Sequence, residues 1–267
     1  MPRLPRRTFV KSALVGSATL ATAAANPDNA VPNTQGAAGS DVEGYDYRKP
    51  MLDDGITLLF QGDSITDMKW GRNQKDRNHY LGHSYVFLIA SRLHADLPAS
   101  KLNFLNRGMS GHTVGDLKKR WQNDALDLKP DVLSILVGIN DVGRAVRSKS
   151  KVHIQQFETD YRSVLDQSLK ANAKLKIVLL EPFVLKVGKL DAPWWDDYRS
   201  QTDNVRAVVN KLAAEYKTLL IKTQSIFDSA AEQSGASHWL WDGVHPLPQG
   251  HELIARNWIE TVSTPGR

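Results

Sequence analysis

The segment ITLLFQGDSITD, residues 56–67, places a short apolar run directly before a Gly-Asp-Ser turn. The run Ile56–Phe60 has the length of a strand and is too apolar for a half-exposed one, so it fits a parallel sheet that is covered on both faces. The turn would present Ser64 at the start of a helix, where backbone N–H groups can stabilise a developing negative charge. Taken alone, the same turn also fits a simple helix N-cap.

Short apolar runs alternate with longer amphipathic segments along the chain, which is the pattern of βα units around a parallel sheet. The runs of strand length are Ile56–Phe60, Leu102–Leu105, Val132–Val137, Ile177–Leu180 and Leu219–Ile221. The segments with helical spacing are Leu81–His94, Val114–Leu126, Ile154–Ala171, Asp196–Tyr216 and Gln249–Val262. We therefore predict one α/β domain over residues 51–267, with three α/β/α layers and about five parallel strands in a doubly wound order.

Residues suited to chemistry follow the predicted strands, where the binding crevice of such a sheet lies. Gly108 follows the second run, and a glycine lets the backbone approach a ligand closely. Asn140 follows the third run, and its side-chain amide is a neutral donor that could reach the same ligand atom as the Gly108 N–H. Near the C-terminus, Asp242 precedes His245 by three residues, so the carboxylate can fix the imidazole tautomer while Nε2 takes a proton from a serine.

Each of these features has a structural alternative, namely a loop glycine, an Asx turn or a surface Asp/His pair. Asp242 and His245 could also be two metal ligands, but no third ligand has convincing spacing, so no metal site is predicted. The whole set supplies what acyl transfer needs at separate element ends. Ser64 would be the nucleophile, His245 the base, Asp242 the carboxylate that orients the base, and Gly108 and Asn140 oxyanion donors. That combination favours acyl transfer.

The same residues carry a resemblance to a known family. The blocks Gly62–Asp67, Gly108, Gly138–Asp141 and Asp242–His245 occur in the order found in SGNH hydrolases of the GDSL esterase/lipase family, over about residues 56–260. The resemblance implies a flavodoxin-like sheet and no cofactor. Within the family, the chain resembles the bacterial branch that includes carbohydrate acetylesterases and lysophospholipase-like esterases.

The family's roles carry over to single residues of this chain. The resemblance implies that Ser64 is the nucleophile, that His245 is the base and that Asp242 orients the base. It further implies an oxyanion hole made of the Ser64 N–H, the Gly108 N–H and the Asn140 side chain.

Tryptophans stand in the loops that would choose the substrate. Trp194, Trp195 and Trp241 lie beside polar groups, as rings that stack on sugars do, and with Asp63 they are our predicted substrate-binding residues. Core or rim packing is the alternative for each tryptophan. No long apolar loop suggests a lid for insoluble lipid. A short acyl group, acetyl first, on a carbohydrate is therefore favoured over a lysophospholipase or a broad arylesterase/thioesterase, and a non-catalytic carbohydrate-binding protein is the alternative from another class.

Composition excludes several other classes. The chain has 267 residues, 34 Lys and Arg against 29 Asp and Glu, a net charge of +5 and no cysteine. Without cysteine it has no disulfide, no thiolate nucleophile and no Cys-ligated zinc. Four of the basic residues, Arg3, Arg6, Arg7 and Lys11, stand in the first 25 residues, and without them the charge falls to +1. A nucleic-acid partner is therefore not expected.

The first 25 residues have the form of a cleaved export signal. A basic start with Arg6-Arg7-x-Phe9-x-Lys11 precedes an uncharged run that ends in Ala23-Ala24-Ala25. The paired arginines resemble a twin-arginine (Tat) signal, and a Sec signal is the alternative. We expect residues 26–50 to be a flexible lead-in. We therefore predict that the protein is periplasmic or secreted, that it uses the twin-arginine export machinery and that it has no stable membrane anchor.

Overall fold

Five parallel strands form the sheet of the computed structural model, which describes residues 52–263. The strands are β1 (Thr57–Gly62), β2 (Asn103–Asn106), β3 (Val132–Leu136), β4 (Lys176–Leu180) and β5 (Leu219–Ile221). Their spatial order is β2-β1-β3-β4-β5, which is the flavodoxin-like doubly wound order. The predicted fold class is confirmed.

The predicted signal peptide (1–25) and lead-in (26–50) lie outside the described residues. Within the part of the chain that the structure describes, no helix is long and apolar enough to cross a membrane.

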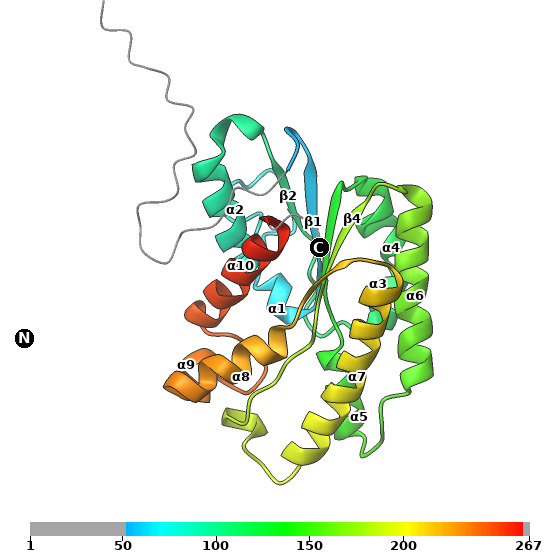
Figure 1. Cartoon of the computed structure of the whole chain (residues 1–267), viewed down its shortest axis with the longest axis vertical. Coiled ribbons are helices and arrows are strands. Elements are labelled where there is room, and N and C mark those ends of the chain that lie inside the picture. The colour runs from blue at the N-terminus through cyan, green and yellow to red at the C-terminus, as the bar shows by residue number, and fades with distance from the viewer. Residues whose placement is uncertain (1–51, 264–267) are drawn as a thin grey trace, which may run out of the picture. The chain divides into compact units, whose positions relative to one another are not determined.

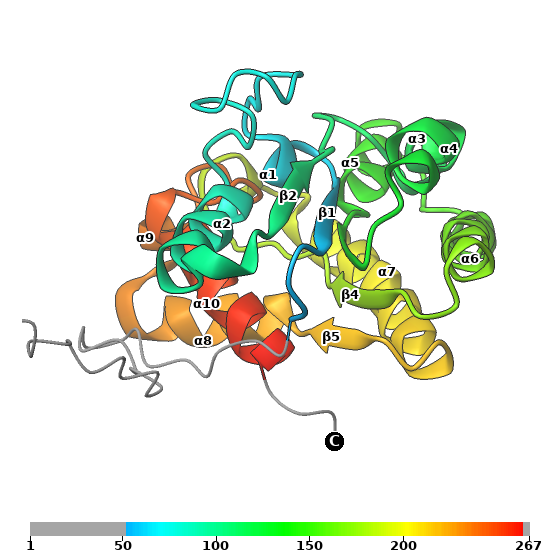
Figure 2. The same cartoon turned by 90° about the horizontal axis from the view of Figure 1, so that it is seen from above.

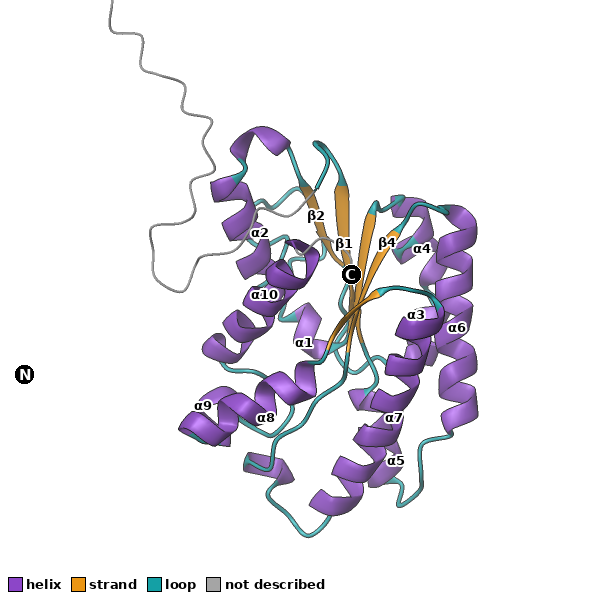
Figure 3. Cartoon of the chain, viewed as in Figure 1, coloured by secondary structure: helices purple, strands orange, loops and turns teal. Residues whose placement is uncertain are grey.

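Helices cover both faces of the sheet, as the side views in Figures 1 and 3 and the view from above in Figure 2 show. Helices α2, α8 and α10 lie on one side, and α3, α6 and α7 lie on the other. The helices are α1 (Ser64–Asp67), α2 (Tyr85–Asp96), α3 (Val114–Lys119), α4 (Trp121–Asp124), α5 (Ile139–Arg147), α6 (Ile154–Ala171), α7 (Trp195–Glu215), α8 (Thr223–Ser234), α9 (Ala236–Trp239) and α10 (Pro248–Ser263). Three 3₁₀ turns are η1 (Pro98–Ser100), η2 (Leu126–Leu128) and η3 (Gly188–Leu190).

Apolar side chains on both faces of the central strands form the core. Leu58, Leu59 and Phe60 of β1 are fully buried, as the continuous apolar run requires. Phe60 packs on Trp258 of α10 with ring centroids 5.3 Å apart. The indole N–H of Trp258 donates to Ser134 Oγ of β3 at 3.1 Å, so the one polar atom of this buried ring is satisfied.

The helix predictions differ from the structure in one break, one start and three omitted helices. The segment Val114–Leu126 is not one helix, because the backbone leaves the helical region at Arg120 and divides it into α3 and α4. Helix α2 begins at Tyr85 rather than Leu81, since the Ser84 hydroxyl caps it by accepting the N–H of Val86. Helices α5, α8 and α9 are absent from the sequence-based prediction.

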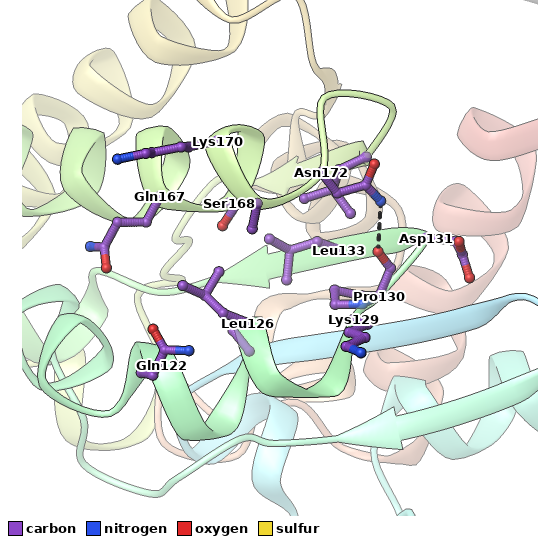
Figure 4. A pocket seen from close by; sticks show the side chains of 13 residues that line it. Gln122, Leu126, Lys129, Pro130, Asp131, Leu133, Gln167, Ser168, Lys170 and Asn172 are labelled. Carbon is purple, nitrogen blue, oxygen red and sulfur yellow. Dashed lines mark hydrogen bonds between the residues drawn. The ribbon is translucent and has the colours of Figure 1, made fainter.

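Two hollows lie at opposite ends of the sheet. One, of about 610 Å³, is lined by Ser64, Asn140 and His245, which follow or face the carboxyl ends of strands. The other, of about 760 Å³, opens beside the start of β3. Figure 4 shows its lining between η2 and the last turn of α6, with Leu126 and Leu133 in its centre and Gln122, Gln167 and Lys170 around them.

Candidate active site

Ser64, His245 and Asp242 form a hydrogen-bonded chain at the carboxyl end of the sheet. Ser64 Oγ lies 2.7 Å from His245 Nε2. His245 Nδ1 lies 2.9 Å from Asp242 Oδ2. In this arrangement Nδ1 donates to the carboxylate, so Nε2 is left as an acceptor for the serine proton. The structure thus brings together three residues that the sequence separates by as many as 181 positions.

Local turns hold both partners of this contact. Ser64 opens α1, and Asp63 Oδ1 caps that turn by accepting the N–H of Ile65 at 3.0 Å. On the other side, Asp242 Oδ1 accepts the N–H groups of Val244 and His245 at 3.1 and 2.9 Å. These bonds occupy one carboxylate oxygen within the turn and leave the other for the imidazole.

The Asp242–His245 pair is tuned to keep the carboxylate charged and the imidazole basic. Burial alone would raise the pKa of Asp242, but hydrogen bonds from His245 and the turn lower it to about 2. The hydrogen bond to Asp242 raises the pKa of His245, and burial opposes that rise. The histidine is therefore a stronger base than an exposed one.

Asp63 does not occupy the position that the sequence predicts for a substrate contact. Its side chain is 1% exposed, it does not line the pocket, and its Oδ1 is used by the α1 turn. Burial raises its pKa to about 7. We therefore correct the prediction: Asp63 shapes the turn that presents Ser64 and is shielded from a substrate.

Two of the predicted oxyanion donors are available. The Ser64 N–H has no acceptor among the described residues, as expected at the first position of a helix. The Asn140 side chain lines the pocket and donates through Nδ2 to the His112 carbonyl at 3.1 Å. That bond fixes the amide and leaves its second N–H for another acceptor.

The third predicted donor, Gly108, is engaged elsewhere. Its N–H donates to Asn106 Oδ1 at 2.9 Å and is therefore not free for an oxyanion. A Cβ at this position would lie 2.4 Å from the Asp67 nitrogen, so a close approach to α1 requires the glycine. The prediction of Gly108 as an oxyanion donor is therefore corrected.

Gly111 is a second glycine of the same loop, which the sequence-based prediction did not name, and its N–H is free to act as a donor. It lies in the same loop, is exposed and has a φ of +81°, and its N–H has no acceptor among the described residues. The next residue, His112, supplies the carbonyl that holds Asn140. No signal in the sequence separates the two, since Gly108 and Gly111 are both loop glycines that follow the second predicted strand.

The loop after α1 braces this region and was also missed. Trp70 Nε1 and Arg72 Nη1 donate to the Gly108 carbonyl at 2.9 and 3.0 Å. Asp67 Oδ2 accepts from Arg72 at 2.6 Å and from the Ser110 N–H and hydroxyl at 2.9 and 2.7 Å. These bonds tie the loop that carries Gly111 to the helix that carries Ser64.

The predicted tryptophans occupy three different positions. Trp194 is 51% exposed and lines the pocket. Trp241 is 57% exposed, and its ring centroid lies 6.3 Å from that of His245. Trp195 is half-buried against the core and does not line the pocket. Two of the three rings are thus placed to meet a substrate.

The described residues offer no alternative metal chemistry at this site. Across residues 52–263, no group of three or more His, Cys, Asp and Glu side chains could hold a metal ion. Glu181, which also follows a strand, is buried and bonds to Arg206 and Asn210.

The sheet and the site together define an α/β ester hydrolase, and comparison with known proteins gives its family. The sequence profile of the GDSL-like lipase/acylhydrolase family matches residues 60–253, and the chain belongs to this family. It is 33% identical to an acetylxylan esterase from Geobacillus stearothermophilus, over 78% of this chain and 94% of that protein. The chain is a carboxylic ester hydrolase.

Solved structures agree with this assignment. A protein from Parabacteroides merdae, described as a GDSL-like lipase, has a TM-score of 0.75 and 35% identity, over 80% of this chain and 98% of its own. The crystal structure of an acetylxylan esterase from Geobacillus stearothermophilus has a TM-score of 0.70 and 34% identity, over 80% of this chain and 97% of its own.

Proposed function

We propose that this chain is an exported esterase that removes acetyl groups from a carbohydrate, with Ser64, His245 and Asp242 as its catalytic residues. The 2.7 Å contact between Ser64 Oγ and His245 Nε2 carries the proposal, because it provides a nucleophile with its base already in place. Asp242 holds the imidazole in the required tautomer.

The first half of the reaction forms an acyl-enzyme. His245 Nε2 takes the Ser64 proton as Oγ attacks the ester carbonyl carbon, and the carbonyl oxygen becomes an oxyanion. The N–H groups of Ser64 and Gly111 and the free amide N–H of Asn140 stabilise that charge. The intermediate then collapses: the bond to the sugar oxygen breaks, and His245 returns the proton to the departing hydroxyl.

The second half releases the acid. A water molecule gives a proton to His245 and attacks the acetyl carbonyl, and a second oxyanion forms at the same donors. Breaking of the bond to Ser64 Oγ then frees acetic acid, and the proton on His245 returns to the serine. Asp242 stays ionised throughout, in keeping with its low pKa.

Two observations support acetyl and carbohydrate as the two halves of the ester. The acetylxylan esterase relative is matched over 94% of its length. The exposed rings of Trp194 and Trp241 at the site offer flat surfaces of the kind on which sugars stack. Release of acetate from acetylated xylo-oligosaccharides tests this, and no acetate would contradict it.

A broad arylesterase is the second candidate. Ile139, Val146, Leu190 and Val244 line the pocket, and such apolar side chains could accept a longer acyl chain. Rates on acetyl, butyryl and octanoyl aryl esters separate the two: we expect a fall with chain length, and a rise would favour the second candidate. A fluorophosphonate probe should label Ser64, whereas a non-catalytic binding protein would stay unlabelled.

Export is supported by the sequence of residues 1–25. A fusion of this segment to a reporter enzyme tests it. We expect the reporter outside the cytoplasm, and replacement of Arg6 and Arg7 by lysine should retain it inside. Export that is unaffected by both changes would point to the Sec route.

A further inference from the structure

We propose that the acetylated carbohydrate bears a carboxylate, as in a uronic acid unit, and that Arg147, Lys149 and Lys189 bind it beside the catalytic residues. This inference rests on the proposed function and names the class of its substrate. It predicts a preference for acidic over neutral acetylated oligosaccharides.

The three cations line the pocket that holds Ser64 and His245. Arg147 is the last residue of α5, Lys149 follows two residues later, and Lys189 belongs to η3. Two segments some 40 residues apart thus bring positive charge to one hollow. All three side chains are exposed, so a substrate can reach them from solvent.

These charges lack a carboxylate partner among the described residues. The only carboxylate that lines the pocket is Asp242, which is bonded to His245. Of the ion pairs within residues 52–263, none includes Arg147, Lys149 or Lys189. Unpaired like charges that converge on a binding site raise the local concentration of an anionic ligand.

Two neighbouring cations, in contrast, are paired. Arg144, one turn before Arg147 on α5, is bonded to Asp116 at 2.9 Å. Lys151, two residues after Lys149, is paired with Asp197. The paired residues do not line the pocket, and the unpaired ones do. The segment from 144 to 151 therefore leaves its free charges on the substrate side.

Two of the cations lie against other residues of the site. The Arg147 guanidinium lies over Gly143, with Nη1 3.2 Å from where a Cβ would be, and both residues line the pocket. Lys189 Nζ lies 5.3 Å from the centre of the Trp241 ring, which itself stands beside His245. A sugar stacked on Trp241 would bring its substituents close to Lys189.

A carboxylate suits this set better than a lipid phosphate does. A guanidinium binds either anion with two parallel hydrogen bonds, and two ammonium groups add charge without fixed geometry, so the rest of the ligand decides between them. Sugar rings also explain the exposed tryptophans, whereas a lipid chain would need a long apolar surface. A sulfated sugar would bring a negative charge to the same cations, so the test below includes a sulfated substrate as well.

The test compares kcat/KM on acetylated xylo-oligosaccharides that differ only in one uronic acid side group. Since each exposed charge pair contributes roughly two- to five-fold, we expect the acidic substrate to be favoured about ten-fold at low salt. High salt should bring the ratio close to one. A ratio of one at low salt, or a larger gain from a sulfated analogue, would overturn the proposal.

Charge reversal locates the effect. Lys149→Glu and Lys189→Glu should each lower the ratio of acidic to neutral substrate by about five-fold or more. Lys186→Glu is the matched control, because Lys186 is exposed on the same loop as Lys189 but does not line the pocket. It makes the same change in net charge and should leave the ratio unaltered. An equal fall in the control would show a general charge effect and refute the assignment.

Binding to the Ser64→Ala protein separates this inference from the proposed function. Calorimetry with acidic and neutral oligosaccharides measures the preference without turnover. If neither substrate releases acetate and the acidic one still binds more tightly, the proposed function fails and the charge assignment stands. If both release acetate equally and bind equally, the charge assignment fails and the esterase stands.

Discussion

The two hollows at the ends of the sheet make an instructive pair, because the larger one has the weaker chemistry. Each contains a serine, but the serines differ in their partners. Ser168 Oγ, in the pocket of Figure 4, donates to the Val164 carbonyl at 2.6 Å and accepts from Trp121 Nε1 at 3.0 Å. Ser64 Oγ faces an imidazole instead. A serine becomes a nucleophile through the base beside it, and pocket volume adds nothing to that.

Strand direction explains why the two ends differ. Helices α1 and α5 begin at the carboxyl ends of the strands, so their free N–H groups point toward the Ser64 pocket. Helix α6 ends at the other pocket, where its last turn presents carbonyl groups. An oxyanion is stabilised at the first end and repelled at the second. The same sheet therefore has one end that suits acyl transfer and one end that does not.

Exchanging the two serines for alanine should give the largest contrast. Ser64→Ala should lower kcat/KM on an aryl acetate by on the order of 10⁴- to 10⁶-fold with an unchanged melting temperature, because only the nucleophile is lost. Ser168→Ala should leave kcat/KM unchanged and lower the free energy of unfolding by about 1–3 kcal/mol, since it leaves the buried Trp121 N–H without an acceptor. Substantial turnover by the Ser64→Ala protein would refute the mechanism.

The second largest contrast should come from replacing one aspartate at each end of the sheet by asparagine. His245 must be neutral to accept a proton, and Asp242 raises its pKa above the ordinary 6.5, so activity should be lost as the pH falls through that raised value. Asp242→Asn removes the carboxylate that raises the pKa of His245. We expect the acidic limb of the pH–rate profile to move to lower pH and kcat to fall by ~10⁴-fold.

Asp131 lines the other pocket and provides the control. Its Oδ2 accepts the Thr57 N–H at 2.9 Å, and Asp131→Asn keeps an oxygen for that bond. The pH–rate profile of this variant should overlie that of the unaltered protein. An acidic limb that stays in place in Asp242→Asn would show that another group controls it.

The order of elements was predictable because it depends on local pattern. The apolar runs that become β1 to β5 are continuous, and the helical periodicity of Ile154–Ala171 is unbroken, so α6 has the predicted bounds. The break at Arg120 was not predictable from periodicity. Its side chain bonds to Asp124 and to the Gly62 carbonyl, and the second of these contacts comes from a strand 58 residues away.

The site divides in the same way. Ser64, Asp242 and His245 could be found because their roles depend on residue type and on short spacings. The choice between Gly108 and Gly111 depends on the direction of the Asn106 side chain, which tertiary bonds from its Nδ2 to the Thr66 and Leu81 carbonyls fix. Arg147, Lys149 and Lys189 were missed for a related reason: their lack of partners becomes visible only when every nearby carboxylate has been placed.

Two asparagines offer the smallest of these contrasts. Asn140, after β3, lends an amide N–H to the oxyanion, and one such donor typically contributes ~100- to 1000-fold. Asn172, at the end of α6, donates to the Pro130 carbonyl at 3.2 Å beside the other pocket. Asn140→Ala should therefore reduce kcat far more than it raises KM, because the donor acts on the transition state. Asn172→Ala should cost about 1 kcal/mol of stability and no activity. Steady-state kinetics and thermal unfolding of both variants decide the point: an Asn140→Ala enzyme with full kcat would leave the Ser64 and Gly111 N–H groups as the whole oxyanion hole.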